Sequence, residues 1–220
     1  MDKNSQCYIV LRALVFIGLI GYLLYSLFLQ DSKELHQQIQ QEIAASKAII
    51  PSDRWQAVIE NTENTFKVLV TKYGMIERLN SVLIPTKDAK PSRGINNIAE
   101  KAMSFNYNAA RNTPLLVFQS IYRWFLMLGW FWVFLPFLAA LLLDGMYQWK
   151  LKRYVFGKVT VQFYRIWFRA FWLITFLSIT YLLLPNLSLF NNIAQLFPPL
   201  ALLVLGISLN RLWANYQKLM

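Results

Sequence analysis

A stretch of twenty residues without a charge constrains this chain more than any other feature. It runs from Trp124 to Leu143 (WFLMLGWFWVFLPFLAALLL). A helix rises about 1.5 Å per residue, so the stretch is about 30 Å long and matches the hydrocarbon thickness of a bilayer. Asp144-Gly145 and a strongly basic segment follow directly. Because Lys and Arg gather on the cytoplasmic side of spans, the stretch predicts both a membrane span and its orientation.

The composition agrees with a membrane protein. Hydrophobic residues make up 56% of the chain and charged residues only 15%, against about 25% in soluble domains. The net charge of +11 is uneven, since residues 31–113 hold eleven basic and nine acidic side chains and the remaining excess flanks apolar runs. The charge is therefore first a signal of topology. Nucleic acid is the competing partner of a basic chain, and direct nucleic-acid binding is not favoured here.

Three further apolar runs predict spans: Ala13–Leu29, Ala170–Leu184 and Ile193–Leu209. The first lacks a small-x-small cleavage site, so we expect an uncleaved anchor, with a cleaved signal peptide as the alternative. Basic residues lie in three places: beside the N-terminal run, within the segment 144–169, and at the C-terminus. A topology with four spans places all three groups in the cytoplasm. The predicted protein is thus a multi-pass protein of the bacterial inner membrane with both termini cytoplasmic.

The predicted fold class is an all-α membrane protein: four transmembrane helices with a helical periplasmic insertion between spans one and two. The predicted organisation is an anchor helix (1–30), a helical periplasmic region (31–113), the second span (114–143), a basic cytoplasmic interfacial segment (144–169), and spans three and four with the C-terminus (170–220).

Helical periodicity organises the region 31–113. Residues 31–50 read as a continuation of the first helix into water. Residues 53–84 carry one apolar stripe from Trp55 to Leu83, which predicts a single long helix. We expect the two helices to pack as an antiparallel hairpin within the chain, with an intermolecular coiled coil as the alternative. A further helix begins near residue 95, and Pro114 predicts a break before the second span.

The segment 144–169 is the predicted interaction site. Tyr, Trp and Phe alternate there with basic residues, a pattern typical of a helix at a membrane surface. A topological role alone is the simpler interpretation, and docking of a cytoplasmic partner is the more specific one. Asp144 is the acidic residue of the segment, and we expect it to form a salt bridge, with Arg169 as one candidate. The basic residues of the predicted site are Lys150, Lys152, Arg153, Lys158, Arg165 and Arg169.

No pattern in the chain predicts an enzyme. Gly-rich phosphate loops are absent, and the single cysteine and single histidine exclude a Cys pair and a His-rich metal pattern. We also find no Ser/His/Asp arrangement that the one histidine could serve. Charged residues lie at the ends of the apolar runs, whereas ion pathways use charges in their middle. We therefore expect no catalytic residues, no metal site and no cofactor.

The C-terminal half, residues 115–220, resembles a family of integrating-conjugative-element membrane proteins of unknown biochemical role. Members are typically encoded beside the coupling ATPase of conjugative type IV secretion systems. The resemblance implies an inner-membrane accessory protein of DNA transfer and no catalytic residues. It is carried by Leu143-Asp144-Gly145, Lys152-Arg153, Phe156-Gly157, Phe163-Tyr164-Arg165, Tyr181–Pro185, Phe197-Pro198-Pro199 and Leu205-Gly206-Ile207.

Three functions follow as hypotheses. The first is a structural subunit of a conjugative apparatus whose partners are membrane lipids and other transfer-system membrane proteins, a coupling ATPase among the candidates; oligomerisation is open. The second is a small transport or pore subunit. The third is an exclusion- or immunity-type membrane protein that blocks transfer into a recipient.

Overall fold

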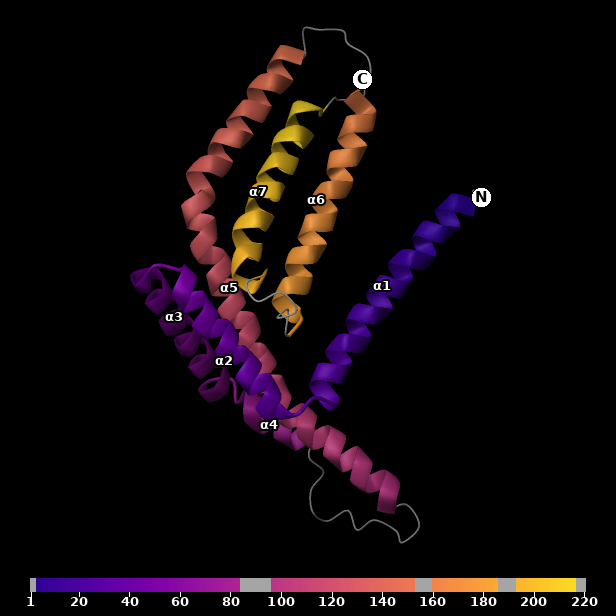
Figure 1. Ribbon diagram of the computed structural model, residues 1–220, viewed down its shortest axis with the longest axis vertical. Helices are drawn as coiled ribbons and strands as arrows, with labels where there is room; N and C mark the ends of the chain where they lie inside the picture. The colour runs from indigo at the N-terminus through magenta and orange to yellow at the C-terminus, as the bar shows by residue number, and fades with distance from the viewer. Residues whose placement is uncertain (1–2, 84–95, 153–159, 186–192, 217–220) are drawn as a thin grey trace. The chain divides into compact units, whose positions relative to one another are not determined.

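The computed structural model describes residues 3–83, 96–152, 160–185 and 193–216. These residues form seven helices and no strand (Figure 1), which confirms the all-α prediction. They fall into two compact units: the described residues within 1–123 and 182–190, and those within 124–181 and 191–220. The helices are α1 (Lys3–Phe28), α2 (Ser32–Ile49), α3 (Ser52–Thr71), α4 (Met75–Leu83), α5 (Asn96–Lys152), α6 (Thr160–Leu183) and α7 (Ile193–Ala214).

Three stretches of helix are long and apolar enough to cross a membrane: Ser104–Leu151 in α5, Phe163–Leu183 in α6 and Gln195–Ala214 in α7. The predicted first span, in α1, meets this test only together with α2, as a pair bent by 112°. The described helices therefore contain three candidate spans, or four if that bent pair is one.

The junction between α1 and α2 departs from the expected straight continuation. The chain bends by 112° between Phe28 and Ser32. Asp31 is the N-cap of α2, and its carboxylate accepts a hydrogen bond from the backbone N–H of Lys33 at 3.2 Å. A capped new helix start satisfies backbone donors that a straight helix would pair internally. The polar helix α2 therefore runs in a different direction from the apolar helix α1.

Helices α2 and α3 form the predicted intrachain hairpin (Figure 1). Leu35 and Ile39 of α2 and Val58 and Thr62 of α3 are buried. The predicted single helix over residues 53–84 is wrong, because α3 ends at Thr71 and α4 begins at Met75. Gly74 lies between them with a positive φ of 57°, a conformation that glycine adopts without steric cost and that commonly ends helices.

Helix α5 is continuous through Pro114, so the predicted break there is wrong. A proline inside a helix costs about 3 kcal/mol, and packing on both sides of it must offset that cost. Ala109, Ala110 and Asn112 are buried just before Pro114, and Gln119 is buried just after it. At its other end α5 continues past Gly145 to Lys152, so the first part of the basic segment is helical.

In the second unit, residues 124–152 of α5 pack against α7. A Cβ added to Gly206 would lie 2.6 Å from Cδ2 of Leu138, so glycine permits the close approach of these helices. The rings of Tyr181 and Phe197 stack with centroids 4.6 Å apart and join α6 to α7. These contacts place α5, α6 and α7 together as one three-helix unit.

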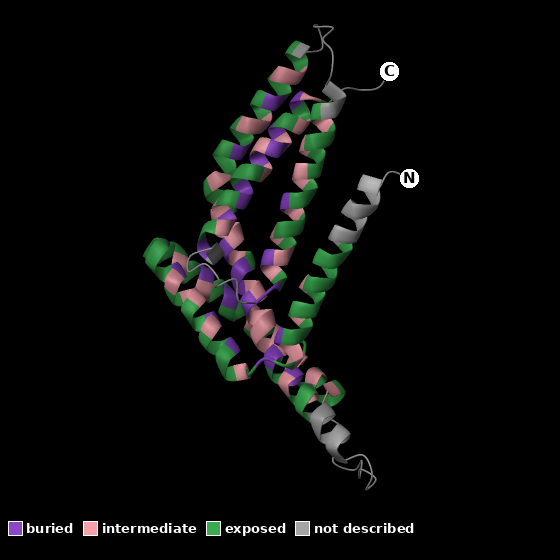
Figure 2. Cartoon of the chain, turned by 45° about the vertical axis from the view of Figure 1, so that its right-hand side comes forward, coloured by how far each residue is buried: buried purple, intermediate pink, exposed green. Residues whose placement is uncertain are grey.

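Exposure is high along the part of α1 from residue 13 onward, which is mostly green in Figure 2. The consecutive residues Leu14, Val15, Phe16 and Ile17 are each more than half exposed. Four consecutive helical residues point in all directions around the axis. The part of α1 from residue 13 to residue 25 is therefore apolar on every side, as expected for a helix surrounded by hydrocarbon or by other apolar helices.

Candidate functional site

The structure describes half of the predicted basic site in atomic detail. Lys150 near the end of α5 is exposed, as are Arg165 and Arg169 one turn apart on α6. Lys152 ends α5, but its side chain lies outside the described residues, as do Arg153 and Lys158. The rings of Tyr164 and Tyr216 lie 6.2 Å apart and place the start of α6 beside the end of α7.

Asp144 forms hydrogen bonds to two neutral amides. Its Oδ2 accepts from Gln148 Nε2 at 2.7 Å, one turn further along α5, and from Asn210 Nδ2 at 2.9 Å on α7. No ion pair joins Asp144 to Arg169, so the suggested pairing of these two residues is not found. The broader prediction, a salt bridge from Asp144 to a nearby Arg or Lys, is not tested for Arg153 and Lys158, which lie outside the described residues.

Asn210 fastens α7 to α5 beside this carboxylate. Its Nδ2 also donates to the backbone oxygen of Leu141 at 2.6 Å, and the residue is only 4% exposed. The two helices approach closely here, because a Cβ on Gly145 would lie 2.8 Å from the Asn210 carbonyl oxygen. Gly145 therefore serves helix packing, a role that its place after an apolar span did not reveal.

A buried ion pair in the first unit was not anticipated from the sequence. Arg123 of α5 is fully buried, and its Nε and Nη2 donate to the two carboxylate oxygens of Glu42 of α2, each at 2.7 Å. Gln119, one turn earlier on α5, donates to the same carboxylate at 2.7 Å. Arg123 Nη1 donates to the backbone oxygen of Leu184, just after α6.

This network joins three segments that are distant in sequence: α2, α5 and the residue that follows α6. Two parallel hydrogen bonds from guanidinium to carboxylate are the strongest form of such a pair. Burial of a charge is tolerated only when it is paired and hydrogen-bonded, as it is here. The available signal was Arg123 itself, which directly precedes the uncharged stretch from Trp124. A charge at the edge of an apolar run requires a partner or a polar interface, but the sequence did not identify Glu42.

A second polar contact holds the end of α1. Asn112 of α5 is buried, and its Nδ2 lies within hydrogen-bond distance of the backbone oxygens of Ser26, Leu27 and Gln30, at 3.0, 3.3 and 2.9 Å. Asn108 donates to the oxygen of Phe28 at 3.3 Å. The last carbonyls of a helix have no partner inside the helix. The two asparagines supply donors to them where the chain turns into α2.

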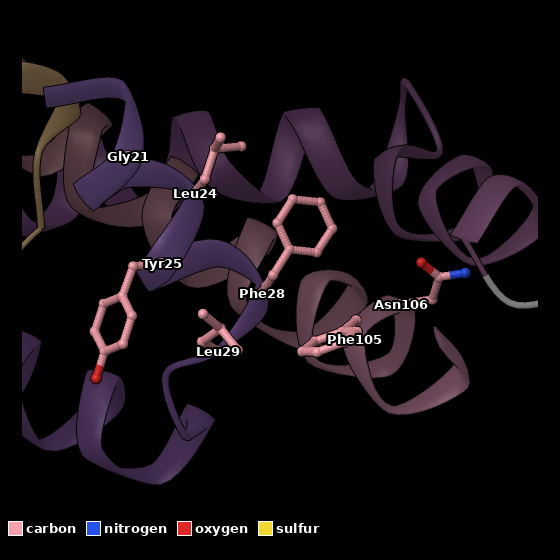
Figure 3. A pocket seen from close by; sticks show the side chains of 7 residues that line it. All are labelled: Gly21, Leu24, Tyr25, Phe28, Leu29, Phe105 and Asn106. Carbon is pink, nitrogen blue, oxygen red and sulfur yellow. The ribbon is translucent and has the colours of Figure 1, made fainter. Parts of the chain in front are cut away.

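An open groove of about 580 Å³ lies beside this contact (Figure 3). Its lining is almost wholly apolar and comes from the C-terminal half of α1 and from α5. Asn106 is its single amide side chain, and no charged residue lines it. The lining residues are Gly21, Leu24, Tyr25, Phe28, Leu29, Phe105 and Asn106.

The described residues contain no cluster of three or more His, Cys, Asp or Glu side chains able to hold a metal ion. His36 forms a hydrogen bond of 2.9 Å with Gln40 on the exposed side of α2. The prediction that the chain has no metal site, cofactor or catalytic residue stays an expectation.

The described residues define an all-helical protein with three candidate membrane spans, polar contacts that fasten helix to helix, and exposed cations on α5 and α6. The chain belongs to the DtrJ-like family, described as IncC plasmid conjugative DNA transfer protein DtrJ-like, whose model matches residues 29–217. Searches with the chain match no curated protein and no solved structure.

Family membership confirms the resemblance to proteins of conjugation. The match includes α2, α3 and α4, whereas the sequence resemblance was confined to residues 115–220. The family description refers to plasmid transfer, so the link to an integrating element remains a prediction.

Proposed function

We propose that this protein is an accessory inner-membrane subunit of a conjugative DNA-transfer apparatus of the type IV secretion class. Membership of the DtrJ-like family over residues 29–217 is the observation that carries the proposal. The candidate spans in α5, α6 and α7 support membrane insertion. In the proposed topology α1 is a fourth span, both termini are cytoplasmic, and α2, α3 and α4 lie in the periplasm.

The two sides of the membrane would then offer different contact surfaces. The exposed cations Lys150, Arg165 and Arg169 would face the cytoplasm, where a coupling ATPase or another transfer subunit docks. The α2–α3 hairpin would contact periplasmic components of the apparatus. The Glu42–Arg123 pair supports a hairpin that presents a defined surface, because it fastens α2 to α5 within the first unit.

Deletion of the gene from a conjugative element, followed by complementation in trans, tests the function. We expect transfer frequency to fall on deletion and to recover with the wild-type chain. Affinity capture of the tagged chain from donor cells after cross-linking should recover other transfer subunits. Unchanged transfer on deletion, or capture without any transfer subunit, would contradict the proposal.

The same strains separate the alternative functions. An exclusion-type protein acts when it is expressed in the recipient and lowers transfer into that cell, whereas an accessory subunit is required in the donor. A transport or pore subunit would support flux in liposomes that is abolished by substitution of Arg123 or Asp144. Each of these results would replace the proposed function.

A further inference from the structure

Four exposed cations gather at one end of the unit formed by α5, α6 and α7. Lys150 lies near the end of α5, Arg165 and Arg169 lie in the first part of α6, and Arg211 lies in the last turn of α7. The Asn210–Asp144 hydrogen bond joins the ends of α7 and α5. The Tyr164–Tyr216 contact joins α6 to the same end. We name these four residues the basic end.

The basic end has no protein counter-charge among the described residues. Asp144 is the one carboxylate between residues 124 and 216, and it is hydrogen-bonded to the amides of Gln148 and Asn210. The ion pairs of the described chain, Lys67–Glu63 and Arg123–Glu42, both lie in the other unit. The described residues of this unit therefore offer the basic end no ion-pair partner.

Large apolar side chains alternate with these cations. Leu151 next to Lys150 is 70% exposed, and Ile166 next to Arg165 is 58% exposed. The exposed apolar surface continues from them along the helices, for example through Trp172 and Leu173 on α6. A soluble acidic protein or a nucleic acid would leave the aliphatic side chains in water. The boundary between lipid headgroups and acyl chains accommodates both kinds of side chain at once.

We infer that the basic end binds the phosphate groups of anionic phospholipids in the adjacent leaflet. The cations supply the charge complementarity, and the neighbouring apolar and aromatic side chains enter the acyl boundary. This inference rests on the proposed membrane insertion. It goes beyond that proposal because it identifies lipid phosphate groups as the negative charges that pair with the basic end. Attraction to anionic lipid is about 1 kcal/mol per basic residue near the surface, which corresponds to roughly a fivefold change in affinity per charge.

The test measures lipid binding to the purified full-length chain in detergent by native mass spectrometry. Phosphatidylglycerol, with one negative charge, is compared with zwitterionic phosphatidylcholine. The double variant R165Q/R169Q removes two charges from exposed positions. Its matched control, K33Q/K72Q, removes two exposed cations from the unit that contains α2 and α3. Helix content by circular dichroism and elution volume report that each variant is folded.

We expect the wild-type chain to bind phosphatidylglycerol in preference to phosphatidylcholine. The R165Q/R169Q variant should bind phosphatidylglycerol roughly 25-fold more weakly, and the control variant should bind it like wild type. Equal binding of the two lipids, or unchanged binding by R165Q/R169Q, would overturn the inference. Binding of a short DNA, measured in the same way, gives a further outcome. If R165Q/R169Q loses DNA binding but keeps phosphatidylglycerol binding, the inference is also overturned.

Transfer frequency is a separate readout. A gene deletion without effect on transfer contradicts the proposed function and leaves the lipid measurement intact. Conversely, lost transfer in R165Q/R169Q with normal phosphatidylglycerol binding contradicts the lipid inference alone and favours a protein partner for the basic end.

Discussion

The guanidinium of Arg123 and the carboxylate of Glu42 form a bidentate ion pair, with both nitrogen–oxygen distances at 2.7 Å. Arg123 is fully buried, and the Glu42 side chain is 9% exposed. The residues are 81 positions apart. Their pairing fixes α2 on the part of α5 that belongs to the first unit.

We predict that Glu42→Gln destabilises the protein by about 3 kcal/mol or more, because it leaves the Arg123 guanidinium buried without a counter-charge. Glu63→Gln is the matched control, since Glu63 belongs to an exposed pair with Lys67 at 3.8 Å. That pair should contribute less than about 1 kcal/mol. Denaturant unfolding in a mild detergent measures both, and similar effects of the two substitutions would show that the buried pair is not special.

Asn112→Leu should loosen the junction between α1 and α2. The substitution removes the donor that serves the oxygens of Ser26 and Gln30, and a buried polar group without its partner costs about 1–3 kcal/mol. Hydrogen–deuterium exchange should rise in peptides that cover residues 26–35. Asn106→Leu, on the same helix, is the control. Exchange that rises equally in both variants would assign the effect to general destabilisation of α5.

Three glycine-to-alanine substitutions should differ in a defined order. Gly145→Ala places a Cβ 2.8 Å from the backbone oxygen of Asn210, so a helix must shift, at a cost of about 1–3 kcal/mol. Gly206→Ala meets the ends of the Leu138 and Leu141 side chains, which can rotate, and should cost less. Gly21→Ala meets nothing within 4 Å and should stabilise α1 slightly. Thermal unfolding in detergent gives the order, and a reversed order would contradict the packing of α5 on α7.

Asp144→Asn should change stability by less than about 0.5 kcal/mol, because a carboxamide oxygen can still accept from Asn210 and Gln148. Asn210→Leu should cost about 1 kcal/mol or more, because it removes both hydrogen bonds between α7 and α5. Unfolding of the two variants distinguishes a hydrogen-bonding role of Asp144 from an ionic one. A large loss in Asp144→Asn would instead indicate a salt bridge with a residue such as Arg153 or Lys158.

The proposed four-span topology predicts that Cys7 and residue 33 lie on opposite sides of the membrane. Cys7 is the single cysteine of the chain, so it serves as its own probe. We expect a membrane-impermeant maleimide to label Lys33→Cys in a Cys7→Ser background in intact spheroplasts. Cys7 itself, and Lys150→Cys in the same background, should be labelled only after lysis. Labelling of Cys7 and residue 33 from the same side would show that α1 does not cross the membrane.

The local elements of this chain could be predicted from its sequence because each depends on neighbouring residues. The uncharged run from Trp124 to Leu143 marks the middle of α5, and helical periodicity marks the α2–α3 hairpin. The boundaries of the helices were less predictable. Pro114 does not break α5, where buried residues lie on both sides of it. Gly74 separates α3 from α4, although the apolar stripe of residues 53–84 continues past it.

The partners of the buried polar groups were decided by tertiary structure alone. Arg123, Asn112, Asn210 and Gly145 are visible in the sequence, and Arg123 even signals that it needs a counter-charge. Glu42 is one of nine acidic residues between positions 31 and 113, and local pattern cannot select among them. The selection follows from the 112° bend after α1 and from the continuity of α5, which bring positions 42 and 123 together. Sequence thus determined the class of protein and its helices, while packing determined which side chains meet, because pairing energies depend on distances that the chain reaches only when folded.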